Sequence, residues 1–300
     1  FVSKNVHLAK RMCNEINRLK INCPLIEIHN RPYLLKTIRK RIKNAKIILF
    51  FHNDPLEMRG SKSIKERKYI INNCSAICFV SNYIKNQFLI NLNENTDKLH
   101  VIYNGVNLVS KIKYDKQKLV TFVGRLVEEK GAHLFLEATK KLHKKYKNWD
   151  FMIIGSTRLG NNSKSKYSRK IIELISDMGS NVKFTGYLPY NKTQTLMKKS
   201  EILIVPSIWD EPFGLVVAEG MMCGCAIIAS NKGGIPEIIK DKGIVLDKID
   251  TKKITSSLEL LIKNNFLRHY YQKMAKHRFS FTAKKAAKAL DNLRKKIIKE

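Results

Sequence analysis

The sequence predicts an α/β protein with two domains, each built around a parallel β-sheet and separated by a cleft. Short apolar segments alternate with amphipathic segments along nearly the whole chain, which is the order of elements in parallel α/β proteins. Apolar segments such as 46–52 (KIILFFH) lack a polar face, as expected of strands buried on both sides. A polar, basic stretch at 107–118 separates two such series and is typical of an interdomain linker. We therefore predict domains at residues 1–108 and 119–278, a linker at 109–118 and a C-terminal basic helix at 279–300.

In the N-terminal domain, apolar residues at helical spacing predict an amphipathic helix over residues 2–20. The other expected helices are 31–44, 62–73 and 83–92, and the expected strands are 23–29, 46–52, 75–81 and 98–106. A doubly wound domain would be expected to begin with a strand, whereas this chain begins at Phe1 with a helix and without an initiator Met. We therefore expect the first strand and helix of this domain to be missing from the chain.

In the C-terminal domain, the pattern predicts six strands and several helices. The expected strands are 119–125, 149–156, 181–187, 201–207, 225–230 and 243–247. Helices are expected at 131–146, near 167–178, from Phe213-Gly214 onward, and throughout the tail from residue 251. P-loop and GxGxxG motifs are absent from the sequence, so neither of these phosphate-binding loops is expected.

The net charge of +32 is concentrated at the two ends of the chain. Residues 1–50 contribute +10 and residues 251–300 contribute +11. An anionic membrane surface or a nucleic acid would account for this excess, and so would compositional drift in a chain rich in Lys, Ile and Asn. We do not expect nucleic-acid binding, because RNP-type aromatic motifs and helix-turn-helix signals are lacking.

The sequence has no run of about 18 apolar residues, so it predicts no transmembrane helix. Its six cysteines lack CxxC pairs and the Cys/His spacing of zinc sites. Small, reduced core residues are the expected role for these cysteines, which favours a cytoplasmic location.

The central stretch for function is residues 206–224 (PSIWDEPFGLVVAEGMMCG), where a strand is followed by a turn and a helix. Glu211 lies just ahead of the predicted helix and Glu219 about two turns within it. In parallel α/β domains, ligands bind outside the carboxyl ends of strands, near the free N–H groups of helix N-termini. Two carboxylates here suit a ligand that carries both hydroxyl and phosphate groups. An ordinary strand-to-helix turn with a capping acid is the alternative on spacing alone.

Four segments together resemble the retaining glycosyltransferases of family 4. They are FVGRLVEEKG (122–131), EPFGLVVAE (211–219), NKGGIPEII (231–239) and IYNGV (102–106). Members of this family have the GT-B fold, with two Rossmann-like domains, and carry a pair of glutamates with seven residues between them. Glu211 and Glu219 have this spacing. The resemblance covers nearly the whole chain from about residue 24.

The resemblance implies roles for the residues around the glutamate pair. Glu219 would bind the ribose hydroxyls of a nucleotide, and Glu211 would lie against the donor sugar near the reacting carbon. Backbone N–H groups at the helix N-terminus would face the sugar or phosphate; these belong to Phe213, Gly214 and Leu215. Gly233 and Gly234 are expected to allow a ligand to approach the backbone closely.

Arg125 and Lys130 would hold the diphosphate of the donor and stabilise its leaving charge. The sequence has no DxD motif to hold a metal ion there, and two fixed cations can supply the same electrostatic stabilisation. We therefore expect no metal and no cofactor besides the nucleotide-diphosphate sugar itself. A solvated charge at a strand end is the alternative for either residue taken alone.

In the N-terminal domain, His52 follows a buried strand and is expected to point into the cleft. Family members have a histidine here that contacts the donor sugar and phosphate, with Asn53 beside it in this chain. His29, after an earlier strand, is expected to face the cleft and contact the acceptor. A lone histidine after a strand is, however, often a structural residue. The HNRP and HNDP segments are reminiscent of bacterial surface-polysaccharide members.

These features predict a retaining, metal-independent hexosyltransferase in cell-surface glycan or lipopolysaccharide synthesis. Its acceptor would be a saccharide or lipid-linked saccharide, with the basic ends in peripheral contact with the inner membrane. The family's glycine-rich loop after the first N-terminal strand has no counterpart in this sequence. Alternatives are another GT-B activity, such as a sugar phosphorylase or nucleotide-sugar epimerase, and a basic nucleic-acid-binding protein without enzymatic activity.

Overall fold

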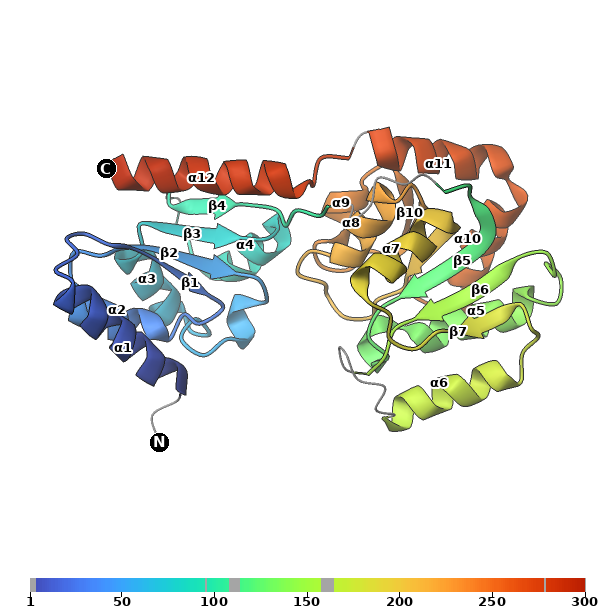
Figure 1. Ribbon diagram of the computed structural model, residues 1–300, viewed down its shortest axis with the longest axis horizontal. Coiled ribbons are helices and arrows are strands. Elements are labelled where there is room, and N and C mark those ends of the chain that lie inside the picture. The colour runs from blue at the N-terminus through green and yellow to red at the C-terminus, as the bar shows by residue number, and fades with distance from the viewer. Residues whose placement is uncertain (1–3, 95, 108–113, 158–164, 278, 300) are drawn as a thin grey trace. The chain divides into compact units, whose positions relative to one another are not determined.

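The computed structural model describes residues 4–94, 96–107, 114–157, 165–277 and 279–299 (Figure 1). The chain forms two compact units. Unit 1 comprises Phe1–Gly105 and Lys284–Glu300, and unit 2 comprises Val106–Ala283. The C-terminal helix therefore returns to the N-terminal part of the chain and belongs to its fold.

Unit 1 contains a four-stranded parallel sheet in the order β1-β2-β3-β4. Its strands are β1 (Leu25–His29), β2 (Lys46–Phe51), β3 (Ala76–Phe79) and β4 (Leu99–Val101). Its helices are α1 (Lys4–Arg18), α2 (Leu34–Arg41), η1 (Pro55–Glu57), α3 (Ile64–Asn73), α4 (Asn82–Leu89) and α12 (Ala283–Lys299). In the register of β1 and β2, His29 is paired with Phe50, so the two strands end side by side.

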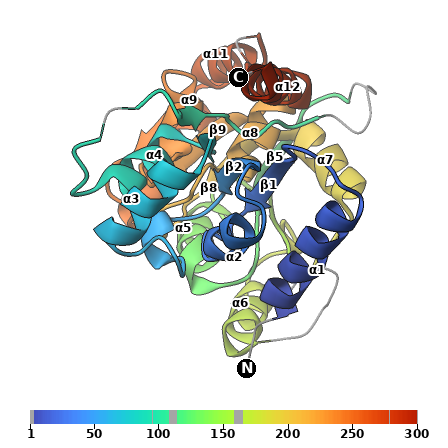
Figure 2. The same cartoon turned by 90° about the vertical axis from the view of Figure 1, so that its left-hand side faces the viewer.

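Helices cover both faces of this sheet (Figures 1 and 2). On one face, Leu293 and Ile297 of α12 pack on Ile48 and Phe50 of β2. On the other face, rings of β2, β3 and α4 form an aromatic cluster made of Phe51, Phe79 and Phe88. The apolar strands predicted here are therefore buried on both sides, as parallel strands require.

Unit 2 contains a six-stranded parallel sheet in the order β10-β9-β8-β5-β6-β7. Its strands are β5 (Gln117–Val123), β6 (Asp150–Ile154), β7 (Val182–Phe184), β8 (Ser200–Val205), β9 (Ala226–Ser230) and β10 (Gly243–Leu246). Its helices are η2 (Glu128–Lys130), α5 (Ala132–Leu142), α6 (Lys166–Ser176), α7 (Tyr190–Lys199), α8 (Leu215–Met222), α9 (Ile235–Ile239), α10 (Thr251–Lys263) and α11 (Asn265–His277). Counted within the unit, this is the strand order 3-2-1-4-5-6 of a dinucleotide-binding fold.

Alternate side chains of the central strands face two different layers. Even-numbered residues such as Phe122 and Ile204 pack with α5, α6 and α10 in the main apolar core. The opposite face carries α7, α8, α9 and α11. A Cβ atom on Gly220 of α8 would lie only 2.1 Å from the Leu203 side chain of β8. Glycine at this position therefore lets α8 approach the sheet closely, besides loosening the helix as its propensity predicts.

The prediction of an α/β protein with two parallel sheets is confirmed, the N-terminal sheet being the smaller. The predicted linker lies partly outside the described residues, and β5 already begins at Gln117. Five of the six cysteines are buried thiols as expected, but Cys23 is exposed because it lies in the turn before β1. Among the described helices, none combines the length and the apolar character needed to cross a membrane.

Candidate active site

The site lies in unit 2, at the place where the strand order reverses. β5 and β8 are neighbours at the centre of the sheet, but the chain leaves them toward opposite edges. Their connecting loops therefore diverge and leave a crevice at the carboxyl ends of the strands, where open α/β sheets bind ligands. Arg125 and Lys130 follow β5, and Glu211 follows β8. The topology thus brings together three residues that the sequence had singled out separately.

Lys130 and Glu211 form an ion pair at this crevice. The Lys130 ammonium lies 2.5 Å from Glu211 Oε1, and the two side chains are only 18% and 11% exposed. The Ser207 hydroxyl donates a 2.7 Å hydrogen bond to the same carboxylate oxygen. The ammonium also lies 5.2 Å from the centre of the Trp209 ring, close enough for a cation–π interaction. Lys130 is thus held at one position by a carboxylate and an aromatic face.

The backbone around Lys130 requires a glycine. Gly131 has a φ of +72° and caps the start of α5. A Cβ atom here would lie 2.1 Å from the Pro206 carbonyl oxygen, so a larger residue would push the two loops apart. The Ile208 N–H donates to the Glu129 carbonyl at 2.8 Å and joins the same two loops. These contacts fix the loop after β5 against the loop after β8.

A second glycine loop holds Glu211 from the other side. The Gly234 N–H donates to the Glu211 carbonyl at 2.7 Å. Gly233 has a φ of +58°, and a Cβ atom on it would lie 2.1 Å from the same carbonyl oxygen. From the sequence, we expected these glycines to admit a ligand. In the structure they admit the backbone of Glu211, so their direct role is to position that residue.

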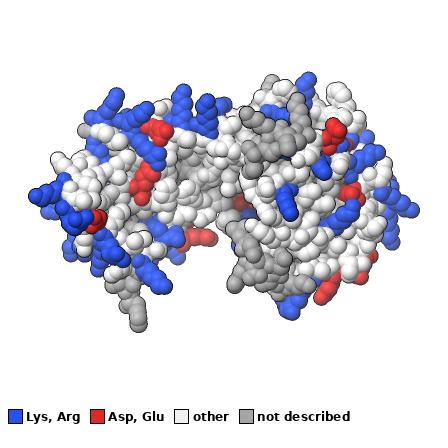
Figure 3. Space-filling model, viewed as in Figure 1, with Lys and Arg blue, Asp and Glu red and all other residues white. Residues whose placement is uncertain are grey.

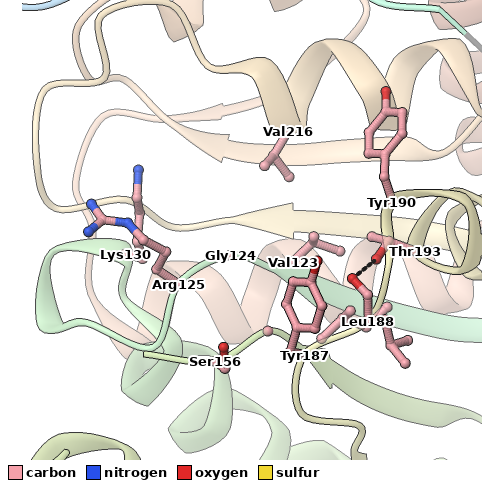
Figure 4. A pocket seen from close by; sticks show the side chains of 12 residues that line it. Val123, Gly124, Arg125, Lys130, Ser156, Tyr187, Leu188, Tyr190, Thr193 and Val216 are labelled. Atoms are coloured by element: carbon pink, nitrogen blue, oxygen red, sulfur yellow. Dashed lines mark hydrogen bonds between the residues drawn. The ribbon is translucent and has the colours of Figure 1, made fainter. Parts of the chain in front are cut away.

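A pocket of about 350 Å³ opens beside the ion pair (Figure 4). Figure 4 shows Arg125 and Lys130 on one side of it and Tyr187 and Tyr190 on the other. The remaining lining residues are Val123, Gly124, Ile154, Gly155, Ser156, Leu188, Thr193 and Val216. Its volume lies within the range usual for small-molecule sites, and its walls are mostly apolar with two cations at one end. Such a pocket suits an anionic group attached to a flat or apolar body.

Helix α8 points its N-terminus at this region. Gly214 has a φ of +99° and precedes the first helical residue, Leu215. The N–H groups of the first turn of an α-helix have no acceptor within the helix, and the helix dipole favours an anion there. Leu215 is exposed and Val216 lines the pocket. The Phe213 ring is instead buried against Phe281, so only backbone groups of this segment are suited to a ligand.

Glu219 is connected to the pocket by Tyr190, a lining residue for which the sequence predicted no role. The Tyr190 hydroxyl accepts a 2.8 Å hydrogen bond from the Gln194 amide, lies 3.4 Å from the Asn107 carbonyl oxygen and interacts with the neighbouring Glu219 carboxylate. Burial raises the pKa of Glu219 to about 7, an effect that the Tyr190 hydrogen bond opposes. Burial and the neighbouring Glu219 raise the pKa of Tyr190 to about 12. Glu219 is therefore close to half-protonated at neutral pH.

The other predicted residues lie in unit 1, at the carboxyl ends of β1 and β2. His29 and His52 form a ring-to-ring hydrogen bond of 2.9 Å, and the His52 N–H donates to the Asn30 side chain at 2.7 Å. Burial and the neighbouring His29 lower the pKa of His52. Asn53 is exposed. Among the residues that the structure describes, no cluster of His, Cys, Asp and Glu is arranged to hold a metal ion.

Two family patterns match the chain. The pattern of glycosyl transferases group 1 matches residues 107–278, more than half of the chain and nearly all of unit 2. This protein is a group 1 glycosyltransferase. The pattern of glycosyltransferase family 4 matches residues 4–109, so both units have their counterpart in this family. The family suggested by the glutamate pair is confirmed.

Curated relatives include bacterial glycosyltransferases of low identity. The chain is 26% identical over 265 residues to YtcC of Bacillus subtilis, covering 81% of this chain and 65% of YtcC. It is 26% identical over 230 residues to the lipopolysaccharide 1,2-N-acetylglucosaminetransferase of Salmonella typhimurium, covering 72% of this chain and 57% of that protein. The chain thus spans less than two thirds of the length of these relatives.

Solved structures show the same fold. A glycosyltransferase from Rickettsia africae superposes with a TM-score of 0.80 at 21% identity, covering all of this chain and 84% of its own. The Anabaena protein HepE, solved in complex with UDP-glucose, superposes with a TM-score of 0.73 at 19% identity, covering 95% of this chain and 82% of its own. At these identities the superpositions establish the GT-B fold.

Proposed function

We propose that this glycosyltransferase moves a hexosyl group from a nucleotide-diphosphate sugar to a saccharide or lipid-linked saccharide, with retention and without a metal ion. The observation that carries the proposal is the ion pair of Lys130 and Glu211, with Arg125 beside it, at the reversal point of the sheet. Sugar transfer from such a donor needs two things here: cations for the departing diphosphate and an acceptor of hydrogen bonds for the sugar hydroxyls. The loop after β5 supplies the cations and the loop after β8 supplies the Glu211 carboxylate, which lies 2.5 Å from the Lys130 ammonium.

Arg125 and Lys130 stabilise the leaving group. The acceptor hydroxyl forms a bond to the anomeric carbon while the bond from that carbon to the diphosphate oxygen breaks, and the bonding electron pair leaves with the diphosphate. The hydroxyl proton passes to the departing diphosphate on the same face of the sugar, which preserves the anomeric configuration. Negative charge grows on the diphosphate during this step. Cations fixed in advance therefore bind the transition state more strongly than the ground state.

Glu211 has two tasks in this scheme. It fixes the position of Lys130 before the donor arrives, through an ion pair that is largely shielded from water. When the diphosphate binds, Lys130 gains a second anionic partner and Glu211 can accept hydrogen bonds from the donor sugar. Ser207 and the Gly234 N–H hold the Glu211 side chain and backbone throughout this exchange.

The nucleoside end of the donor binds toward Glu219 and Tyr190. The two neighbouring hydroxyl groups of a ribose can donate hydrogen bonds to a carboxylate. Glu219 offers such a carboxylate and interacts with Tyr190, which lines the pocket. The complex of HepE with UDP-glucose supports testing uridine nucleotides first. A panel of UDP-, GDP- and ADP-sugars tests the base, with a rise in Tm as the readout of binding.

The proposed acceptor is a lipid-linked or lipopolysaccharide saccharide at the cytoplasmic face of the inner membrane, held by unit 1. Lys and Arg side chains gather along α12 and around α1 (Figure 3). On α1, Leu8 and Met12 are exposed one helical turn apart beside Lys4 and Arg11. Apolar side chains flanked by cations are typical of helices that lie in a membrane interface. The similarity to the Salmonella lipopolysaccharide enzyme supports this acceptor class.

Vesicle binding tests the membrane part of the proposal. The protein should sediment together with vesicles that contain anionic lipid at low salt. The double variant Lys4→Glu, Arg11→Glu should bind these vesicles at least about tenfold more weakly, because each cation near an anionic surface contributes roughly 1 kcal/mol. The matched control is Lys144→Glu, Lys147→Glu on exposed positions of unit 2. If both variants bind like the wild type, α1 does not contact the membrane.

Transfer itself is tested with the donor that stabilises the protein most. Incubation with a saccharide acceptor should give a glycoside of unchanged anomeric configuration in the presence of EDTA. Inorganic phosphate in place of the acceptor distinguishes a phosphorylase, which would release sugar 1-phosphate. Strict dependence on added divalent metal, or inversion of configuration, would contradict the proposed mechanism.

A further inference from the structure

A row of charged and ring side chains in unit 1 ends at His52. Arg294 of α12 donates to both carboxylate oxygens of Glu27, at 2.7 and 2.8 Å. Glu27 Oε2 lies 3.8 Å from His29 Nε2. His29 Nδ1 in turn lies 2.9 Å from His52 Nε2. The C-terminal helix is thereby connected, through β1, to a histidine at the end of β2.

The two imidazole rings are held in a fixed orientation. The His29 ring stacks on Phe50, with centroids 4.4 Å apart and planes 5° apart. The centroids of His29 and His52 are 5.3 Å apart, with planes 17° apart. The His52 backbone is fixed by the Asn30 side chain. The short distance between the two nitrogens is therefore built into the strand ends and does not depend on a flexible side chain.

Two imidazole nitrogens at hydrogen-bond distance hold one hydrogen between them. One ring donates and the other accepts, so both rings cannot be imidazolium ions at the same time. His29 Nε2, the ring nitrogen directed away from His52, faces Glu27, and the carboxylate of Glu27 favours a proton on this nitrogen. Arg294 holds the pKa of Glu27 below its usual range, so the carboxylate stays ionised. A positive charge on the pair is consequently more stable on His29 than on His52.

We propose that His29 and Glu27 form a proton relay for His52, in which a proton taken up at His52 Nδ1 is passed on through the hydrogen bond to His29. In the neutral pair, His52 Nε2–H donates to His29 Nδ1. When His52 Nδ1 accepts a proton, the Nε2 hydrogen moves to His29 Nδ1. His29 becomes the imidazolium beside Glu27, and His52 remains neutral with its other nitrogen protonated.

The relay changes what His52 offers to a bound molecule. His52 Nδ1 alternates between accepting and donating a hydrogen bond, while the ring neither moves nor becomes charged. The lowered pKa of His52, caused by burial and then by His29, agrees with charge residing on the other ring. Arg31 lines the same surface pocket as His29, and the Asp54 carboxylate, two residues after His52, accepts a hydrogen bond from the Leu56 N–H. This assigns His29 as a positioning residue and differs from acceptor contact, the role expected for it from the sequence.

Imidazole nitrogen NMR on the full chain tests the relay without substrate. As the pH falls, the nitrogen chemical shifts should show that His29 becomes an imidazolium first. His52 should remain neutral, and its ring hydrogen should move from Nε2 to Nδ1. His29→Phe keeps the stack on Phe50 but lacks the nitrogens, so His52 should then become charged itself, at a higher pH than any charging of His52 in the wild type. Exposed His269 of unit 2 is the internal control, with the same titration in both proteins. Identical His52 titrations in the two proteins would overturn the proposal.

A role of the relay in catalysis rests on the proposed transfer. His29→Phe and Glu27→Gln should each lower kcat about tenfold with little change in the donor KM, and Glu27→Gln should shift the acid limb of the pH profile. Unchanged pH profiles in both variants would overturn the catalytic role. The NMR result stands by itself if no transfer is found, so the two failures are distinguishable.

Discussion

Lys130 and Glu211 are 81 residues apart in the chain, yet their side chains meet at 2.5 Å where the loops after β5 and β8 converge. The pair is largely buried, and Ser207 bonds the same oxygen of Glu211. Removing one partner of a buried ion pair costs free energy of folding, because the remaining charge is poorly solvated. Losing one partner alone is therefore expected to destabilise unit 2 as well as to change the site.

The first prediction concerns the stability of this pair. Lys130→Met removes the cation and leaves the Glu211 charge buried, which should cost about 3 kcal/mol and lower Tm by several degrees. The double variant Lys130→Met, Glu211→Gln should recover at least half of this loss, since no buried charge is left without its partner. Thermal unfolding of four proteins, namely the wild type, Lys130→Met, Glu211→Gln and the double variant, measures the coupling. Additive losses would show that the two side chains do not interact in solution.

The second prediction concerns the pH dependence of donor binding. The ribose hydroxyls bind the ionised form of Glu219, whose pKa in the free protein is about 7. Donor affinity should therefore be constant above pH 8 and fall by up to about tenfold per pH unit below 7. Titration calorimetry from pH 5.5 to 8.5 measures this slope, and in Glu219→Gln the slope should disappear together with much of the affinity. An affinity that rises as pH falls would contradict the assignment.

The third prediction concerns the stability contributed by the same group. The pKa of Glu219 is higher in the folded than in the unfolded protein. Proton binding by Glu219 therefore contributes to the free energy of unfolding; this contribution is complete below pH 4.5 and is lost as pH rises through 7. Without ligand, Glu219→Gln should be more stable than the wild type at pH 8 by up to about 3 kcal/mol, and the difference should vanish at pH 4.5. Tm measured at both pH values tests this sign. A difference independent of pH would show that Glu219 keeps an ordinary pKa.

The fourth prediction concerns Tyr190. Tyr190→Phe removes the hydrogen bond that lowers the pKa of Glu219, so the pH at which donor affinity begins to fall should move upward. At pH 7 the affinity should fall at least about fivefold, because losing a hydrogen bond worth roughly 1.5 kcal/mol or more to the charged carboxylate lowers the ionised fraction of Glu219. Tyr187→Phe is the matched control, because Tyr187 lines the same pocket. Equal effects of the two substitutions would mean that Tyr190 acts only as part of the pocket wall.

The sequence predicted the fold well because its strands are uniformly apolar and its helices mostly carry a regular apolar stripe. The site was predicted in part. The glutamate spacing and the Arg125–Lys130 segment predicted candidate residues that lie at one crevice, but the 2.5 Å ion pair depends on the order of β5 and β8 in the sheet. Local spacing carries no information about that order. The glycine pair at 233–234 was likewise expected to meet a ligand, although its nearest neighbour is the Glu211 backbone.

Helix α7, which carries Tyr190 and Gln194, was not predicted at all. Its sequence, YNKTQTLMKK, contains Asn and two Thr residues of low helix propensity and only a short apolar segment. The helix forms because it packs on β5, β8 and α8 and buries Met197, which is a tertiary effect. The partner of Glu219 could therefore not be found from the sequence, and neither could its raised pKa.

The most direct test of the proposed site is the affinity for the diphosphate of the donor. Calorimetry should compare the wild type with Arg125→Gln, Lys130→Arg and the control Lys140→Met on the exposed side of α5, each titrated with UDP, GDP and ADP and with the matching nucleoside monophosphates. The wild type should bind one diphosphate at least about tenfold more tightly than its monophosphate. Arg125→Gln should remove most of this preference, while Lys140→Met should retain it. A wild type that binds none of the six nucleotides, or an Arg125→Gln variant with the full preference for diphosphate, would contradict the proposed diphosphate site.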